Sequence, residues 1–450
     1  MLGRMCRAVV IRRCMQTARR AADERLRQSE RTFEFDEGVI KKVEICQLAA
    51  NQPIEDFYSL GRCVSTQAML LAVCDGHGGT ACSRYISAQL LAYVCAAALE
   101  KHIVRDVPVD QRLEWIYSSS DVHLPGHFEV APKLSEFYEA FRRRKEGGTV
   151  REALQTAFDA LDEEISSSAL PDSNGRINRN YRLRASIAAA GSCASLAHIR
   201  NTDVHVANVG DCAAVLGIAT PGGGVSALPL SRAHCVDNMD EVQRVKAAHP
   251  SSETGILRGG RLLGELYPLR AFGDVRYKWP LDLQKAVLGA MGAPPPPNLL
   301  SPPYLSATPE VFYHKLTQND CFLILASDGL WEWFDADTAV RLVRDHSLGA
   351  LSLQPFEPTV GHTLQEVHHA LRARRAGERK KPLDSNSATH LVRYALGGIT
   401  GGVQEQYHRL HDQLLVPAGT ARSYRDDISV IVVHFDPEAI AASMETDDGR

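Results

Sequence analysis

The chain has 450 residues, a formal net charge of −4 at pH 7, 44% hydrophobic residues and 23% charged residues. These values are typical of a soluble globular protein and give no reason to expect nucleic acid or an anionic membrane as the main partner. No run approaches the roughly 18 to 20 apolar residues of a membrane-spanning helix. The eleven cysteines form no CxxC pair and lie mostly in apolar runs, which favours buried free thiols over a disulfide framework or a zinc site.

The N-terminal segment is basic and carries no acid before residue 23. Arginines alternate there with apolar residues such as Leu2, Met5 and Val9. This composition is typical of a mitochondrial transit peptide, and a disordered basic tail is the alternative. We expect residues 1–30 to form a transit peptide and a disordered lead, and the mature protein to reach the mitochondrial matrix.

The first chemically informative stretch follows a strand region that runs from Val43 to Asp56. The apolar run Met69–Val73 predicts a buried strand, and Asp75-Gly76-His77-Gly78-Gly79 comes directly after it. The carboxylate stands at the strand tip, and glycines let the backbone approach a ligand closely. The pattern favours a metal site, and the alternative is a turn in which Asp75 only accepts backbone hydrogen bonds.

Further elements follow in order. Ala81–Leu99 is expected to be a long helix, and Arg151–Leu170 an amphipathic one, because Leu154, Phe158 and Leu161 recur at helical spacing. Strands are expected over residues 185–199, 203–218, 321–325 and 428–435. A proline-rich loop is expected over residues 293–309.

Acidic residues recur at the ends of these strands. They are Glu55, Asp56, Asp211, Asp328, Asp426 and Asp427. Carboxylate oxygens with retained waters are the ligands that Mg²⁺ and Mn²⁺ prefer, and a two-metal site needs a bridging carboxylate and further acids from separate strands. The sequence therefore predicts such a site around Asp75.

Six ordered motifs carry a resemblance to a known family. They are DGHGG, GSCASLAHI, HVANVGDCAAVLG, LRAFGD, ASDGLWE and RDDISVIVV. In this order they are similar to the motifs of the metal-dependent PP2C (PPM) Ser/Thr phosphatases. Other stretches, among them QLAANQPIED, LYPLRAFGDV, PPYL and NSATHL, are similar to one subfamily, the catalytic subunits of the mitochondrial pyruvate dehydrogenase phosphatases.

The resemblance implies an α+β fold, a PP2C-like α-β-β-α sandwich of two mostly antiparallel sheets packed face to face and flanked by helices. We expect one phosphatase domain over residues 40–438, with insertions near 105–146, 280–309 and 346–421, and a tail over 439–450.

The resemblance also implies a set of metal ligands. Asp75 would bridge two Mg²⁺ or Mn²⁺ ions, the Gly76 carbonyl would add a ligand, and Asp328 and Asp426 would bind directly. Two further acids, Glu55 and Asp56, would hold waters around the ions. A third, weaker ion would take Asp211 and Glu332, although Asp211 could equally be a plain turn residue.

The remaining roles concern the substrate and the reaction. His77 is the expected general acid for the leaving alkoxide, and the alternative is a histidine that only hydrogen-bonds metal-bound waters. At the place where typical members carry a phosphate-binding arginine this chain has Asn51, as the pyruvate dehydrogenase phosphatases also do. Arg270 is expected to hold its own loop rather than the substrate.

The implied substrate is the phosphorylated E1 subunit of pyruvate dehydrogenase, with the lipoyl-bearing E2 core and a regulatory subunit as further partners. A phosphatase for another mitochondrial phosphoprotein and a non-catalytic docking homologue are the alternatives. A basic stretch between Arg372 and Lys381 is interpreted as solvated surface, or as a docking site for an acidic partner.

Overall fold

A computed structural model describes residues 19–119, 130–143, 148–170, 180–349, 361–375, 383–401 and 403–448. Residues 1–18, most of the expected transit peptide, lie outside this range, as do Arg379, Lys380 and Lys381 of the basic stretch. The chain divides into two compact units. The first takes residues 1–53, 215–228 and 318–441, and the second takes residues 54–214, 229–317 and 442–450. Each unit is built around one sheet.

The first unit contains a six-stranded sheet in the order β1-β2-β15-β14-β8-β9. Its strands are β1 Arg31–Glu34, β2 Ile40–Leu48, β8 Ala213–Ala219, β9 Val225–Pro229, β14 Asp320–Ala326 and β15 Ile428–Phe435. The central β15 pairs antiparallel with β2 and with β14, and all eight of its residues are buried, which explains its nearly unbroken apolar sequence.

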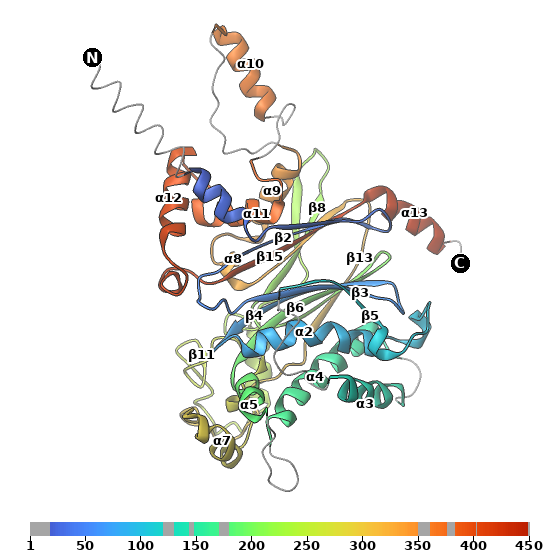
Figure 1. Ribbon diagram of the computed structural model, residues 1–450, viewed down its shortest axis with the longest axis vertical. Helices are drawn as coiled ribbons and strands as arrows, with labels where there is room; N and C mark the ends of the chain where they lie inside the picture. The colour runs from blue at the N-terminus through green and yellow to red at the C-terminus, as the bar shows by residue number, and fades with distance from the viewer. Residues whose placement is uncertain are drawn as a thin grey trace, which may run out of the picture. The chain divides into compact units, whose positions relative to one another are not determined.

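Helices connect the strands of the first unit. They are α8 Asp328–Trp331, α9 Ala336–Ser347, α10 Leu364–Arg375, α11 Ser387–Gly397 and α12 Val403–Leu415, and α13 Pro437–Asp448 follows the last strand. The fully buried α11 lies against β2 and β15 (Figure 1). Residues 19–27 are also helical, and Ala22 and Leu26 are buried in the same apolar cluster as α11.

The second unit contains a seven-stranded sheet in the order β13-β7-β6-β4-β3-β5, with β12 paired to β6. Its strands are β3 Phe57–Cys63, β4 Ala68–His77, β5 Leu113–Ser118, β6 Gly191–Arg200, β7 Asp203–Val209, β12 Phe272–Gly273 and β13 Glu310–Lys315. All the pairs along this order are antiparallel. The fold is therefore α+β with two large antiparallel sheets, as the family resemblance implies.

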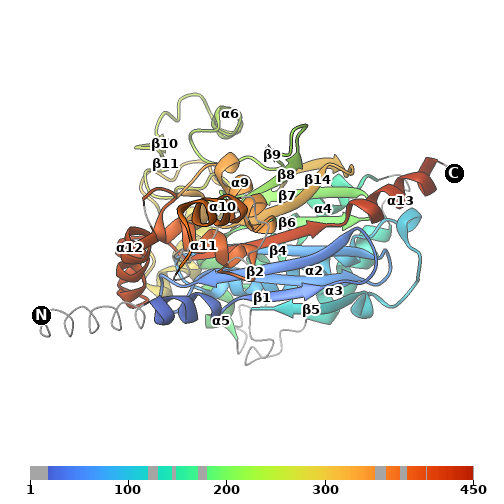
Figure 2. The same ribbon diagram turned by 90° about the horizontal axis from the view of Figure 1, so that it is seen from above.

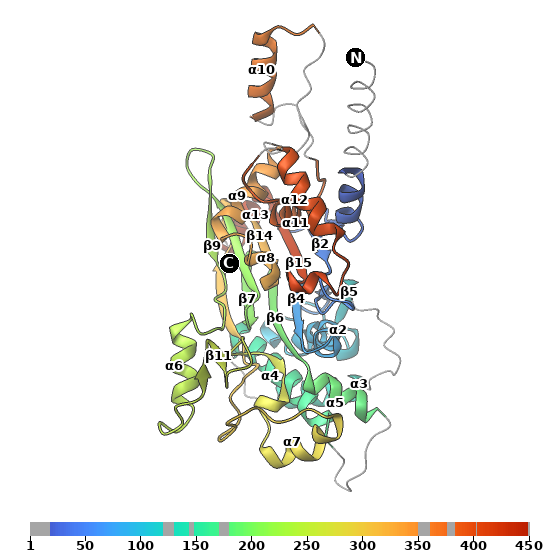
Figure 3. The same ribbon diagram turned by 90° about the vertical axis from the view of Figure 1, so that its left-hand side faces the viewer.

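The helices of the second unit are α2 Ala81–Ala96, α3 Val130–Arg142, α4 Val150–Ser168, α5 Tyr181–Ala189, α6 Met239–Ala247 and α7 Leu281–Val287. The apolar α2 packs on β3, β4 and β6, and α4 packs on α2. A small cluster apart from this core joins α6 to the hairpin of β10 Leu257–Arg258 and β11 Arg261–Leu262 (Figures 2 and 3).

Several sequence predictions of single elements are confirmed. The helix predicted over Arg151–Leu170 is α4, and it buries its predicted apolar face. Residues 293–309 contain no helix or strand. The nine cysteines of the described residues are all free, and eight of them are buried. Among the same residues no helix is long and apolar enough to cross a membrane.

Three strand predictions are wrong in part. Residues 185–189 belong to α5, so that strand begins only at Gly191. The expected strand 203–218 is two strands, β7 and β8, which belong to different sheets and are separated at Gly210. The expected strand over Val43–Asp56 is β2, which ends at Leu48.

A buried ion pair ties α11 to its surroundings. Arg393 and Asp384 are both fully buried and are joined by two hydrogen bonds of 2.7 and 2.8 Å. Arg393 also donates to Asp23 of the N-terminal helix at 2.7 Å. Burial by itself lowers the pKa of Arg393, but the carboxylates around the guanidinium outweigh that effect and raise the pKa overall.

We expect Asp384→Asn to lower the free energy of unfolding by about 3–5 kcal/mol, because it leaves the buried Arg393 without its charge partner. Urea unfolding of the full chain measures this. Glu405→Gln is the control, since Glu405 forms an exposed pair with Arg409, and it should change stability by less than about 1 kcal/mol. Equal effects of the two substitutions would contradict a stabilising role for the buried pair.

Candidate active site

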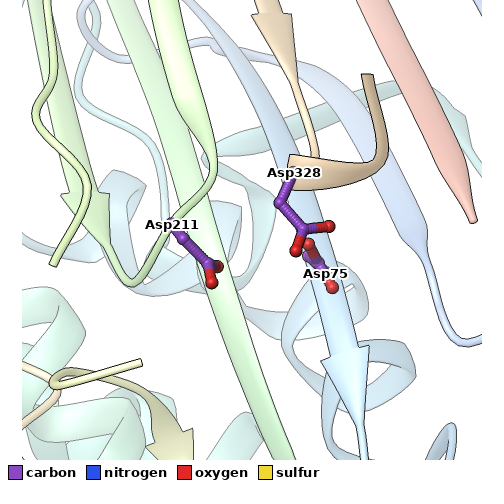
Figure 4. A group of neighbouring side chains, drawn as sticks. All are labelled: Asp75, Asp211 and Asp328. Atoms are coloured by element: carbon purple, nitrogen blue, oxygen red, sulfur yellow. The ribbon is translucent and has the colours of Figure 1, made fainter. Parts of the chain in front are cut away.

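The acidic residues of the second unit stand where strands end. Asp75 is near the end of β4, and Asp211 follows β7 after Gly210, whose φ is 89°. One carboxylate oxygen of Asp75 lies within 4.8 Å of one of Asp211 (Figure 4). Both residues are partly exposed, so a cation between them could keep some of its waters.

The glycine turn after Asp75 is held by Glu55. The Gly79 N–H donates to Glu55 Oε1 at 2.7 Å, and Ser83 Oγ donates to the Glu55 carbonyl at 2.6 Å. A Cβ on Gly76 would lie 2.4 Å from that carbonyl oxygen. Gly76 must therefore be glycine for β4 to approach this segment, and Glu55 orders the turn whether or not it also holds a metal-bound water.

His77 is paired with a carboxylate. Its Nε2 lies 2.5 Å from Oδ2 of Asp274, which is buried and adopts a left-handed conformation with φ of 50°. Burial of the imidazole lowers its pKa, but the charges of Asp274, Asp211 and Glu55 outweigh that effect and raise the pKa overall. The imidazolium form is thus favoured to a higher pH than in an unperturbed histidine.

The pair depends on Gly191 at the start of β6. A Cβ there would lie 2.0 Å from His77 Nε2 and 2.2 Å from Asp274 Oδ2. Any side chain at this position would displace one member of the pair. Sequence reasoning missed Asp274 as the partner of His77, because the two residues are 197 positions apart.

The acids of the first unit lie on two neighbouring strand ends. Asp328, which Figure 4 also labels, is the first residue of α8 directly after β14, and Glu332 follows that short helix. Asp426 lies just before β15. A Cβ on Gly329 would lie 2.0 Å from the Asp427 carbonyl oxygen, so this glycine allows the two strand ends to approach each other.

The three residues directly before β15 have different interaction partners. The buried Asp427 accepts from the backbone N–H groups of Ala50 and Asn51 at 2.5 and 2.8 Å, and from the Asn51 side chain at 3.0 Å. The buried Arg425 donates to the Ala49 carbonyl. Asp426, between them, instead forms an ion pair with Arg422 at 2.6 Å.

Two other residues that the motifs single out have clear positions in the structure. Arg270 donates to Glu241 and to the Thr308 carbonyl, so it holds its loop as expected. Asp56 is buried beside β3, with an exposed fraction of 2%. Burial of the Cys74 thiol raises its pKa, and the charge of Asp56 raises it further.

The candidate donors suit a hard divalent cation. They are carboxylates and a backbone carbonyl, the oxygen ligands that Mg²⁺ and Mn²⁺ prefer. Carboxylates at strand ends and a histidine with a raised pKa are the features expected of a metal-dependent hydrolase.

Comparison with known proteins is more specific. Residues 128–355 match the model of the protein phosphatase 2C family. The chain is 38% identical to mitochondrial pyruvate dehydrogenase (acetyl-transferring) phosphatase 1 of Bos taurus, over 88% of this chain and 78% of that protein. It is 36% identical to mitochondrial pyruvate dehydrogenase (acetyl-transferring) phosphatase 2 of Homo sapiens, over 90% of this chain and 79% of that protein.

Among solved structures, a serine-threonine phosphatase 2C from Toxoplasma gondii is 18% identical with a TM-score of 0.44, covering 90% of this chain and 99% of that one. The chain belongs to the protein phosphatase 2C family. This family is metal-dependent, and membership supports protein phosphatase activity.

The contact between His77 and Asp274 provides a test of the expected acid role. We expect Asp274→Asn to lower kcat on a phosphoserine peptide about 10- to 100-fold, because the neutral amide no longer favours the imidazolium that must protonate the poor alkoxide leaving group. Hydrolysis of p-nitrophenyl phosphate, whose leaving group needs little protonation, should fall only a few-fold.

Both rates are measured on the same preparation, with unchanged thermal unfolding as the check on folding. Gly191→Ala should give the same pattern, since it displaces the pair from the other side. Equal losses on the two substrates would contradict a role for the pair in leaving-group protonation.

Proposed function

We propose that this chain dephosphorylates phosphoserine on the E1 component of mitochondrial pyruvate dehydrogenase and thereby reactivates the complex. The identity of more than one third to two mitochondrial pyruvate dehydrogenase phosphatases supports this substrate. A phosphatase for another mitochondrial phosphoprotein is the second candidate, because identity at this level leaves room for a change of substrate.

The single observation that carries the enzymatic interpretation is the proximity of Asp75 and Asp211 at the ends of two strands. We propose that Asp328 and Asp426 join them, with the Gly76 carbonyl, to hold two Mg²⁺ or Mn²⁺ ions. Asp56 and Glu55 would accept hydrogen bonds from metal-bound waters, and a third ion would take Asp211 and Glu332. When bound, such ions supply a hydroxide-like nucleophile at neutral pH and neutralise phosphoryl charge.

Side chains of the protein would supply the proton that the leaving group needs. Asp274 accepts the hydrogen bond of His77 Nε2, so the proposal assigns the donation to the leaving serine oxygen to Nδ1. Asn51 is assigned to the substrate side of the site, although its amide nitrogen already donates to Asp427. A non-catalytic docking homologue is disfavoured because all four central acids, Asp56, Asp75, Asp328 and Asp426, are present.

The first test is phosphate release from phosphorylated pyruvate dehydrogenase E1 by the purified chain with Mg²⁺ or Mn²⁺. We expect release that requires the metal and that falls at least 100-fold in Asp75→Ala, because this substitution removes the proposed bridging carboxylate. Activity on a phosphoserine peptide but not on E1 would retain the enzyme class and exclude the substrate. No activity on either, in folded protein, would favour the docking homologue.

We further propose the mitochondrial matrix as the location and the E2 core and a regulatory subunit as partners. If the N-terminal segment is a transit peptide, its removal should spare the helix that contains Ala22, Asp23 and Leu26, since this helix is packed into the first unit. N-terminal sequencing of protein isolated from mitochondria should therefore give a start before Ala22. An intact Met1, or a start beyond Leu26, would contradict this processing.

A further inference from the structure

The side chain of Arg422 forms an ion pair with Asp426, a carboxylate that the proposed function assigns to a metal ion. Its Nη1 lies 2.6 Å from Oδ2 of Asp426, and its side chain is 52% exposed. The other oxygen of Asp426 accepts from the Asp427 N–H at 2.7 Å. One oxygen of the proposed ligand is therefore covered by a half-exposed guanidinium rather than by a buried group.

A bound divalent ion would compete with Arg422 for this oxygen. At equal distance the doubly charged ion attracts a carboxylate about twice as strongly as a guanidinium does. An exposed ion pair between residues four apart holds its partners only weakly. The guanidinium would then be released close to the metal site, with its five N–H donors available.

A released guanidinium beside a phosphatase site has a direct use. Phosphate monoesters carry up to two negative charges, and arginine binds two phosphate oxygens at once through its planar fork. The neighbouring side chains cannot supply this charge. Asn51 is neutral and donates to Asp427, and Arg425 is 4% exposed and donates to the Ala49 carbonyl.

We propose that Arg422 is a substrate-binding residue that leaves Asp426 when metal binds and then binds the phosphate of the phosphoserine substrate. It would supply the cationic contact that Asn51 cannot make. The short turn Ala421–Ser423 that carries Arg422 is anchored through backbone hydrogen bonds to Pro417 and Ala421, so the side chain can move without moving the backbone. This inference rests on the proposed function and deepens it.

The test uses the full chain and two binding measurements besides activity. Isothermal titration of Mn²⁺-loaded protein with inorganic phosphate should show affinity about tenfold weaker in Arg422→Ala than in the natural protein. Titration with Mn²⁺ alone should show affinity that is unchanged or a few-fold tighter, because a competing cation has been removed. Arg422→Lys should restore part of the phosphate affinity, since it keeps the charge but not the bidentate geometry.

Arg232→Ala is the matched control. Arg232 is 50% exposed and pairs with Asp240 at 2.7 Å and with Glu310 at 2.6 Å in the second unit. None of these residues is assigned to the site, so removal of Arg232 should leave both affinities unchanged. In turnover, Arg422→Ala should raise KM for a phosphoserine peptide about tenfold.

The outcomes distinguish failure of the proposed function from failure of the role of Arg422. Absence of metal-dependent activity in the natural protein would overturn the proposed function. An active natural protein in which Arg422→Ala leaves phosphate affinity and KM unchanged would overturn the role of Arg422. A loss of Mn²⁺ affinity in that variant would do so too, because it would show that Arg422 supports the metal ligand instead of competing with the ion.

Discussion

Close backbone approach is the constraint on which the candidate site depends. At three places beside the candidate residues, neighbouring groups come closer to a glycine than a Cβ atom would permit. Gly76 approaches Glu55, and Gly329 approaches the carbonyl of Asp427, in both cases at distances that exclude a Cβ. Gly191 makes the same allowance for the contact between His77 and Asp274. These glycines thus permit the close contacts because they have no side chain.

Hydrogen bonds between buried polar groups fix the position of α11 on the sheet of the first unit. Glu44 on β2 is buried and paired with His434 on β15 at 2.9 Å, and it also accepts from the Ser387 N–H at the start of α11. Asn386 caps that helix through Thr389 and donates to the Arg31 carbonyl in β1. A buried polar group without partners is costly, so these bonds specify one placement of α11 on the sheet.

The sequence predicted what local patterns encode. The apolar runs of β14 and β15 and the buried face of α4 are properties of short windows, and they appear in the structure. The turn predicted directly after Asp75 begins later, because β4 continues to His77. The break between β7 and β8 was missed because Val204 to Ile218 is apolar on both sides of Gly210, and periodicity carries no information on which sheet a strand joins.

Pairings between distant residues could not be predicted for the same reason. Asp274 and His77, or Asp384 and Asp23 around Arg393, are partners only because the fold brings them together. Arg422 is the instructive case, since it lies only four residues before Asp426. Spacing permits that pair, but its meaning depends on whether Asp426 or Asp427 is the structural residue.

The hydrogen bonds that each carboxylate accepts favour Asp427 as the structural residue. Asp427 is 1% exposed and accepts three hydrogen bonds from Ala50 and Asn51. These bonds connect the start of β15 to the segment after β2. Its neighbour Asp426 is 18% exposed and pairs with the half-exposed Arg422. If Asp426 is the metal ligand proposed above, the two adjacent aspartates divide anchoring from ligand binding. The Asn51 amide is neutral and already donates to Asp427, so the charge of a bound phosphate would have to be met by metal ions and by a cation such as Arg422.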